Sequence, residues 1–308
     1  MKNLLLYLST VLIWGSTWLA IEFQLGSVNE VVSLFYRFAI AAACMWLYVL
    51  IKRLPMHYSL RDHGFFLLLA IGNFGLNYLF LYWAQGYLTS AMASIAFSLL
   101  LVFNIINTKV FFKKPIAKRI YVGATIGVVG IVSLFWHDLQ HFDLANGAVV
   151  GLLLALAGTI CASFGNMVSV RNSNQQIGVL QGNAWGMLYS ATLLGMYALI
   201  SGQSLLVSAD WPYWGSLAYL AVFGTVIAFA CYFSLLKAIG PEKASYIIVL
   251  FPLVAVVLSS WFEGFEWQTH TFIGFSLVLL GNALVLTPLE KVRAWLYPVS
   301  PVRGESST

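Results

Sequence analysis

Ten stretches of mainly apolar residues follow one another along the chain, and short polar segments separate them. A helix that crosses a membrane needs about 20 mainly apolar residues, each adding a rise of about 1.5 Å. On that template we predict spanning helices over residues 4–21, 31–51, 64–84, 91–111, 120–136, 148–169, 179–200, 213–236, 244–262 and 271–287. The pattern therefore predicts an all-α integral membrane protein with ten transmembrane helices.

The charges of the polar segments alternate along the chain. One set of segments holds Lys52, Arg53, Arg61, Lys113, Lys114, Lys118, Arg119, Arg171, Lys237 and Lys243. The other set has no Lys or Arg and holds Glu22, Glu30, Asp138, Asp143, Asp210, Glu263 and Glu266. Because short basic loops resist translocation, the basic set is predicted to be cytoplasmic, together with both termini.

The overall composition fits a surface that faces lipid. Apolar residues make up 60% of the chain and charged residues 9%, against roughly 25% charged residues in a typical soluble protein. The net charge of +5 could suggest a nucleic-acid partner. Its confinement to loops indicates membrane topology instead, so we expect the lipid bilayer as partner and no nucleic acid.

The chain shows an internal repeat at an offset of 151 residues. This shift places Ala93 and Ser94 on Ala244 and Ser245, and it places Gly123 and Gly130 on Gly274 and Gly281. Each half would hold five helices, and an odd number makes the second repeat enter the membrane from the opposite side. We predict a first repeat over 1–141, an inverted second repeat over 142–290 and a cytoplasmic tail over 291–308. Inverted repeats are typical of alternating-access transporters.

Several segments resemble the EamA family of the drug/metabolite transporter superfamily. They are WGSTWLAIEF (14–23), FYRFAIAA (35–42), LTSAMASI (88–95) and residues 224–281. The resemblance implies a ten-helix permease of the bacterial inner membrane that exports amino acids or other small metabolites. The repeat departs from symmetry at Pro252, whose equivalent is Leu101, and at Gly264 to Glu266, whose equivalents are Lys113 to Pro115. Which helix of the pair bends is therefore left open.

Arg37 is the one charged side chain predicted to lie well inside a span, about 9 Å from the outer end of its helix. A charge at that depth is costly and is often functional. Arg37 could contact a substrate. Alternatively, it could be a structural tether whose guanidinium reaches outward to Glu30, Glu22 or loop carbonyls.

Uncharged polar and aromatic residues at helical spacing form the other candidates for a substrate-binding site. They are Trp14, Thr17 and Trp18 in the first helix, Asn73, Asn77, Tyr78 and Tyr82 in the third, Ser98 in the fourth, Ser163 and Asn166 in the sixth, Tyr232 in the eighth and Tyr246 in the ninth. Such groups could line a cavity for a small zwitterion or planar metabolite. They could equally join helices without any ligand.

No Asp or Glu falls within a predicted span, so the usual relay of proton-coupled carriers is missing. We therefore expect facilitated diffusion or exchange, with no cofactor and no metal. Proton-coupled export of organic cations, drugs or nucleobases is the alternative, and a channel or membrane enzyme is more remote. His137 and His141 have the spacing of a metal pair, but a third ligand is not evident. Glycines at positions 123, 127, 130, 274 and 281 are predicted to let helices pack closely, within the chain or in a homodimer. Without such a dimer we expect a monomer.

Overall fold

The computed structural model describes residues 2–26, 28–113, 115, 117–136, 147–205, 207, 209–239 and 247–287. Within these ranges every regular element is helical. The elements are α1 (Lys2–Glu22), α2 (Glu30–Ile51), α3 (Leu60–Leu69), η1 (Ala70–Leu76), α4 (Asn77–Gln85), α5 (Ser90–Phe97), α6 (Leu100–Phe112), α7 (Lys118–Leu134), α9 (Gly147–Asn174), α10 (Val179–Ile200), α11 (Trp211–Ala218), η2 (Tyr219–Ile227), α12 (Ala228–Ile239), α14 (Ile247–Phe262) and α15 (Thr269–Leu286).

These elements join into ten helical segments within the described ranges, and each segment overlaps one predicted span. Two of the segments, Leu60–Gln85 and Trp211–Ile239, contain a π-helical stretch at their middle. Seven of the ten are long and apolar enough to cross a membrane, judged by length and composition. Ile247–Phe262 is apolar but shorter. The all-helical class is thereby confirmed, while the count of ten spans and the cytoplasmic termini stay predictions.

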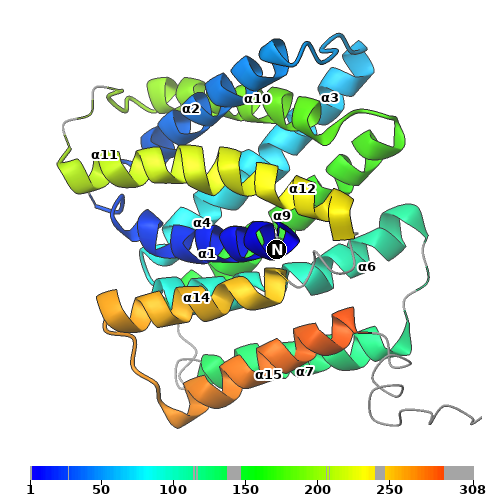
Figure 1. Cartoon of the computed structure of the whole chain (residues 1–308). Coiled ribbons are helices and arrows are strands. Elements are labelled where there is room, and N and C mark those ends of the chain that lie inside the picture. Colours follow the sequence, from blue (N-terminus) through cyan, green and yellow to red (C-terminus); the bar gives the residue numbers. More distant parts are fainter. Residues whose placement is uncertain are drawn as a thin grey trace, which may run out of the picture.

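The helices run side by side across the view in Figure 1. α2 packs on α10 along one edge, and α7 packs on α15 along the opposite edge. α1 lies between these pairs, in contact with α14 and α12. One apolar cluster around Trp18 joins α1 to α5, α9 and α14, and a second around Phe38 joins α2 to α10. α1 therefore stands where the two parts of the core meet.

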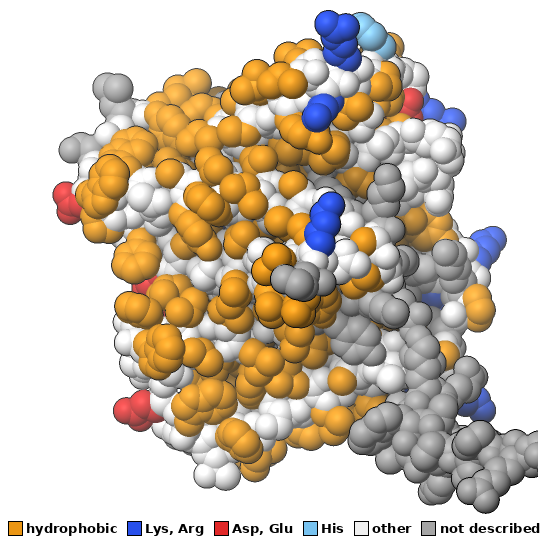
Figure 2. All heavy atoms as spheres, in the orientation of Figure 1, with side chains coloured by type: hydrophobic (Ala, Val, Ile, Leu, Met, Phe, Trp, Pro, Cys, Tyr) orange, Lys and Arg blue, Asp and Glu red, His pale blue; other side chains and the backbone are white. Residues whose placement is uncertain are grey.

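The molecular surface matches the expected lipid environment. Large apolar side chains are widely exposed, including Leu5 at 63%, Ile51 at 68% and Ile200 at 85%. Figure 2 shows apolar side chains over most of one face, with Asp and Glu mainly at its left edge and Lys and Arg mainly toward its right. A continuous apolar surface of this size is unusual for a soluble protein. The acidic and basic helix ends thus separate as the loop charges predict.

Several helices begin at a residue that can accept a hydrogen bond from the first turn. The side chain of Asn29 accepts from the backbone N–H of Val31 at 3.0 Å, and Ser59 accepts from Asp62 at 3.2 Å. Thr89 does the same for α5. Such caps pair backbone donors that have no partner within the helix. They therefore fix where α2, α3 and α5 start.

The two π-helical stretches, η1 and η2, end at Leu76 and Ile227, which are 151 residues apart in the sequence. This distance equals the offset of the predicted repeat. A π-helix widens the turn and displaces backbone carbonyls from their usual donors. Thr225 compensates in η2, because its hydroxyl donates to the carbonyl of Leu220 at 2.9 Å. In η1 the amide of Asn77 donates to the carbonyl of Asn73 at 3.2 Å.

The glycines for which a packing role is predicted bring α7 and α15 into backbone contact. A Cβ added to Gly123 would lie 2.6 Å from the carbonyl oxygen of Gly281, and one added to Gly130 would lie 2.7 Å from that of Gly274. Both distances are shorter than any real Cβ contact, so only glycine fits. The packing role predicted for these glycines is confirmed. These glycines contact one another's helices within the chain, and the homodimer stays a prediction.

In the repeat-related pair of helices, the member without a proline is the one that breaks. α14 contains Pro252 and yet runs without interruption from Ile247 to Phe262. Its predicted counterpart has no proline but breaks at Ser98 and Leu99, between α5 and α6. The Ser98 hydroxyl donates to the carbonyl of Ile95 at 2.6 Å. At the break the backbone N–H of Leu99 donates to the carbonyl of Ala96 at 3.2 Å, a bond three residues back that tightens the turn.

Replacing Gly130 with leucine should prevent the close approach of α7 and α15, because the side chain would meet the backbone of α15. We expect the free energy of unfolding to fall by at least about 2 kcal/mol, which is typical of overpacking in a tight contact. Gly64→Leu is the matched control, since nothing lies within 4 Å of a Cβ at Gly64. Thermal unfolding in detergent measures both variants. Equal midpoints for the two would contradict the glycine contact.

Candidate functional site

The aromatic face of α1 contacts η2 and α12. The indole Nε1 of Trp14 donates to the carbonyl of Gly224 at 3.3 Å. Its ring lies 5.5 Å from the ring of Phe229 and 5.1 Å from that of Tyr232, measured between centroids. A Cβ at Gly224 would come within 2.8 Å of Thr17 Cγ2, so the glycine lets α1 approach η2. Two predicted site residues, Trp14 and Thr17, therefore contact the π-helical stretch, and a third, Tyr232, packs on Trp14 from α12.

One turn further along α1, Trp18 connects the two halves of the core. Its ring stacks on Phe251 of α14 at a centroid distance of 6.1 Å and lies 5.4 Å from Phe97 of α5. Its carbonyl accepts a hydrogen bond from the side-chain amide of Gln85 at 2.9 Å. The side chain is 6% exposed. Trp18 is therefore a packed anchor rather than an open wall.

Amide side chains join η1 and α6 to α9. Asn73 packs against Gly165, where an added Cβ would lie 2.5 Å from the Asn73 Cβ. Asn166 donates to the side-chain oxygen of Asn104 at 3.2 Å. Asn107 donates to the hydroxyl of Ser163 at 2.8 Å. These pairs form a polar seam between helices, which is the alternative that the sequence left open for them.

Arg37 is 1% exposed and reaches toward α4. Its NH1 donates to the hydroxyl of Tyr82 at 3.3 Å, and its guanidinium carbon lies 4.5 Å from the centroid of the Tyr78 ring. Tyr82 in turn donates to Gln24 at 2.7 Å. Within the described residues the ion pair joins Arg171 to Asp62, and no carboxylate pairs with Arg37. The predicted tether to Glu22 or Glu30 is absent from these contacts.

The structure thus gathers the predicted residues into two neighbourhoods and leaves some outside. Arg37, Tyr78 and Tyr82 come together, and so do Trp14, Thr17 and Tyr232. The remaining polar candidates are placed singly: Ser98 bonds within its own helix, Ser163 and Asn166 face α6, and Asn73 and Asn77 share η1 and its end. Tyr246, His137 and His141 lie outside the described residues.

Sequence reasoning missed three amide side chains that bond to candidate residues: Gln24 to Tyr82, Gln85 to Trp18 and Asn107 to Ser163. Gln24 is 1% exposed and Gln85 is 3% exposed, and Asn107 bonds to Ser163. Gln85 lies three residues after Tyr82, so helical spacing alone could have placed it beside the predicted tyrosines. Gln24 follows the end of α1, where a loop residue carries no periodic signal.

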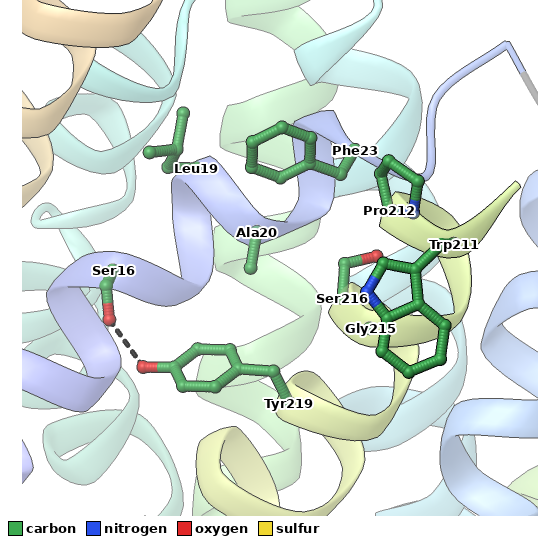
Figure 3. A pocket seen from close by; sticks show the side chains of 9 residues that line it. All are labelled: Ser16, Leu19, Ala20, Phe23, Trp211, Pro212, Gly215, Ser216 and Tyr219. Atoms are coloured by element: carbon green, nitrogen blue, oxygen red, sulfur yellow. Dashed lines mark hydrogen bonds between the residues drawn. The ribbon is translucent and has the colours of Figure 1, made fainter.

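Two pockets open near these residues. The first, of about 330 Å³, lies between α1 and α11–η2. Figure 3 shows its wall, where the Ser16 hydroxyl meets the Tyr219 hydroxyl at 2.6 Å and Trp211 covers one side. The second has about 530 Å³ and is lined by Glu30, Tyr82, Trp83, Gly86, Tyr87 and Leu154. Only the second pocket shares a residue, Tyr82, with the Arg37 neighbourhood.

Polar contacts join the predicted halves at both ends of the helices. At the end that holds Glu22, the carboxylate of Glu263 accepts from the backbone N–H of Ser90 at 3.1 Å and from its hydroxyl at 2.6 Å. At the other end, Arg171 contacts Asp62 at 2.8 Å. The carboxylate of Glu263 thus pairs with the positive end of the α5 dipole.

A bundle of apolar helices with polar groups held in its interior is typical of membrane transporters. The EamA-like transporter family matches residues 1–136 and 149–287, which fall within the two predicted halves. The chain therefore belongs to this family, as the sequence motifs indicate. It is a multi-pass membrane protein, and the family indicates a transporter rather than an enzyme. Within the described residues no group of three or more His, Cys, Asp and Glu side chains could hold a metal ion.

Relatives of known name support this assignment over nearly the full length. The inner membrane transporter YedA of Escherichia coli (strain K12) is 26% identical over 306 residues, covering 96% of this chain and 94% of that protein. Protein PagO of Salmonella typhimurium is 22% identical over 291 residues, covering 92% of each chain. A solved crystal structure aligns with a TM-score of 0.65 at 18% identity, covering 92% of this chain and 95% of that one. It shows a shared fold.

The Glu263 contact yields a direct test. Glu263→Gln should weaken the hold on α5, because a neutral amide accepts a weaker bond from the Ser90 N–H. A double-mutant cycle with Ser90→Ala should give a coupling of about 1 kcal/mol in thermal unfolding. Glu266→Gln, at an exposed loop position whose side chain makes no hydrogen bond among the described contacts, is the control. Additive effects of the Glu263 and Ser90 changes would contradict the contact.

Proposed function

We propose that the chain is an alternating-access transporter of the bacterial inner membrane that exports amino acids or related small metabolites. The observation that carries the proposal is the meeting of α1 with the η2–α12 segment. Trp14 and Thr17 contact Gly224 of the irregular backbone, and the Trp14 ring packs on Tyr232 of α12. Transporters commonly bind substrates at discontinuous membrane helices. The inner membrane is supported by the name of the relative YedA.

Two inverted five-helix repeats form part of the proposal. The equal offsets of η1 from η2 and of the glycine pairs support it. The 151-residue offset relates α1 to α9 and η1 to η2. α1 contacts η2 and α9 contacts η1, as two halves related by symmetry would. In this arrangement one half rocks against the other around a central site. Ten spans with cytoplasmic termini follow from the same proposal.

The carrier is proposed to work by facilitated diffusion or exchange. In the described residues Glu22, Glu30 and Asp62 lie in the first or last turn of a helix, and Asp210, Glu263 and Glu266 lie outside the helices. The interior polar groups are amides, hydroxyls and one guanidinium. None of the neutral ones changes charge near neutral pH. A proton relay of the usual carboxylate kind therefore lacks its acid between the helix ends.

Uptake by the purified protein in liposomes tests the proposal, with amino acids, nucleobases and organic cations as substrates. Saturable flux of amino acids is expected, and saturable flux of nucleobases or cations alone would move the substrate class to the alternative. Single-channel conductance would identify a channel. Absence of saturable flux for every class would contradict a carrier.

A pH gradient imposed across the same liposomes should leave the initial rate unchanged within about twofold. The physical reason is that no titratable carboxylate lies in the middle of a described helix. The matched control is an imposed substrate gradient of equal size, which should drive flux in the direction of the gradient. A steep rise in uptake with the pH gradient alone would show proton coupling.

A further inference from the structure

The neighbourhood of Arg37 contains more hydrogen-bond donors than acceptors. A guanidinium carries five N–H donors and no acceptor. In the described residues Arg37 makes one hydrogen bond, to Tyr82, and its Nε is buried without a partner. The Tyr82 hydroxyl donates its hydrogen bond to the side-chain oxygen of Gln24. The amide nitrogen of Gln24 is also buried without a partner. Two orphaned donors thus belong to one hydrogen-bonded chain of three side chains.

The charge of this cluster is equally unbalanced. The rings of Tyr78 and Phe38 lie against the guanidinium, with centroids 4.5 Å and 5.9 Å from its central carbon. Aromatic faces stabilise a cation but supply no lone pair in the plane of the N–H groups. A buried cation without an anion is costly in a medium of low dielectric constant. An added group with two oxygen atoms would remove both deficits at once.

The cluster adjoins open space. Tyr82 contributes to the wall of the 530 Å³ pocket, together with the aromatic rings of Trp83 and Tyr87. Glu30 lies in the same wall. It precedes Arg37 by seven residues on α2, which is two turns, so the two residues lie on one face of the helix about 10 Å apart along its axis. An acid, Glu30, therefore lies in the wall of the pocket that reaches the cluster at Tyr82.

We propose that Arg37, Tyr82 and Gln24 form the binding site for the carboxylate of the transported substrate. The ligand class is a zwitterionic amino acid, whose carboxylate meets the guanidinium while its ammonium group faces Glu30. This inference rests on the proposed transport function and names its substrate chemistry. The guanidinium fork matches a carboxylate geometrically, and the Gln24 amide adds a further donor to the same group.

Other anions fit the cluster less well. A phosphate ester carries more negative charge than one arginine compensates, and neither η1 nor α4 presents a helix N-terminus here, because they form one continuous segment with α3. Glu30 would repel a second negative charge. A purely structural arginine, in turn, would be expected to use its donors on backbone carbonyls or a carboxylate. The two orphaned donors argue for a ligand that comes and goes.

Calorimetric binding to the purified protein in detergent tests the site without requiring transport. The 20 common amino acids are screened, and the tightest is compared with its primary amide and with the amine that lacks the carboxyl group. We expect the amide and the amine to bind at least about tenfold more weakly, the usual scale for losing one charge-assisted pair. Acetate and 3-phenylpropionate, which lack the ammonium group, should bind more weakly than the amino acid and gain affinity in Glu30→Gln.

Two variants separate ligand binding from packing. Arg37→Gln should weaken amino-acid binding at least about tenfold while leaving the amide and the amine unchanged. Gln24→Glu keeps Arg37 and the shape of the residue 24 side chain. The new side chain supplies a carboxylate from the protein itself, which can pair with Arg37 in place of the ligand. It should raise the thermal midpoint of the ligand-free protein and lower amino-acid affinity at least about tenfold. Arg61→Gln, an exposed change at the basic end of α3, is the control and should alter neither quantity.

Three results would overturn the site. The first is equal binding of an amino acid, its amide and its amine to the wild-type protein. The second is wild-type affinity in both Arg37→Gln and Gln24→Glu. The third is the absence of saturable binding for every amino acid and carboxylate in the panel. The transport proposal itself fails only when liposomes show no saturable flux of any substrate class, so the two failures are distinguishable.

Discussion

The hydrocarbon of the bilayer governs the whole molecule, because it offers the backbone no hydrogen-bond partner. In hydrocarbon each backbone N–H and C=O must find a partner in the protein, and helices satisfy this requirement within a single segment. The described residues accordingly form helices and short connections only. At η1 and η2, where the regular pattern changes, Asn77, Thr225 and Trp14 donate to the displaced carbonyls. Irregular backbone is thus accompanied by side chains that complete it, and two of them, Asn77 and Trp14, are candidate site residues.

The same constraint acts on the polar side chains. Asn166 pairs with Asn104, Asn107 pairs with Ser163, and Gln85 pairs with a carbonyl of α1. These pairs serve packing, and they need no ligand to be stable. Within the described residues, Gln85 also keeps a buried atom, Oε1, without a partner. Arg37 differs from all of these because it is a buried cation that pairs with no carboxylate of the described residues and keeps its Nε donor unpaired. The contrast distinguishes side chains that hold the helices together from side chains that are left ready for something else.

Much of the architecture could be predicted from the sequence because lipid makes hydrophobic length decisive. The predicted range 179–200 coincides with α10, and Gly123 and Gly130 were assigned to packing from their spacing alone. Side-chain partners were less accessible. Helical spacing placed Tyr78 and Tyr82 near each other, but it could not reveal that Arg37 contacts these tyrosines of α4 and pairs with no carboxylate of the described residues. Gln24 was missed since it lies beyond the end of α1, and the break at Ser98 was missed because proline was the expected cause of a bend.

The unequal pair formed by the broken α5–α6 segment and the unbroken α14 has a kinetic consequence. If two halves exchange roles as a carrier turns over, unequal hinges give the inward-open and outward-open forms different free energies. Their populations then differ, and a ligand offered on one side of the membrane finds the competent form more often than a ligand offered on the other. Half-saturating concentrations would therefore differ between the two faces. The final distribution of the substrate would not, because an uncoupled carrier hastens equilibrium and cannot displace it.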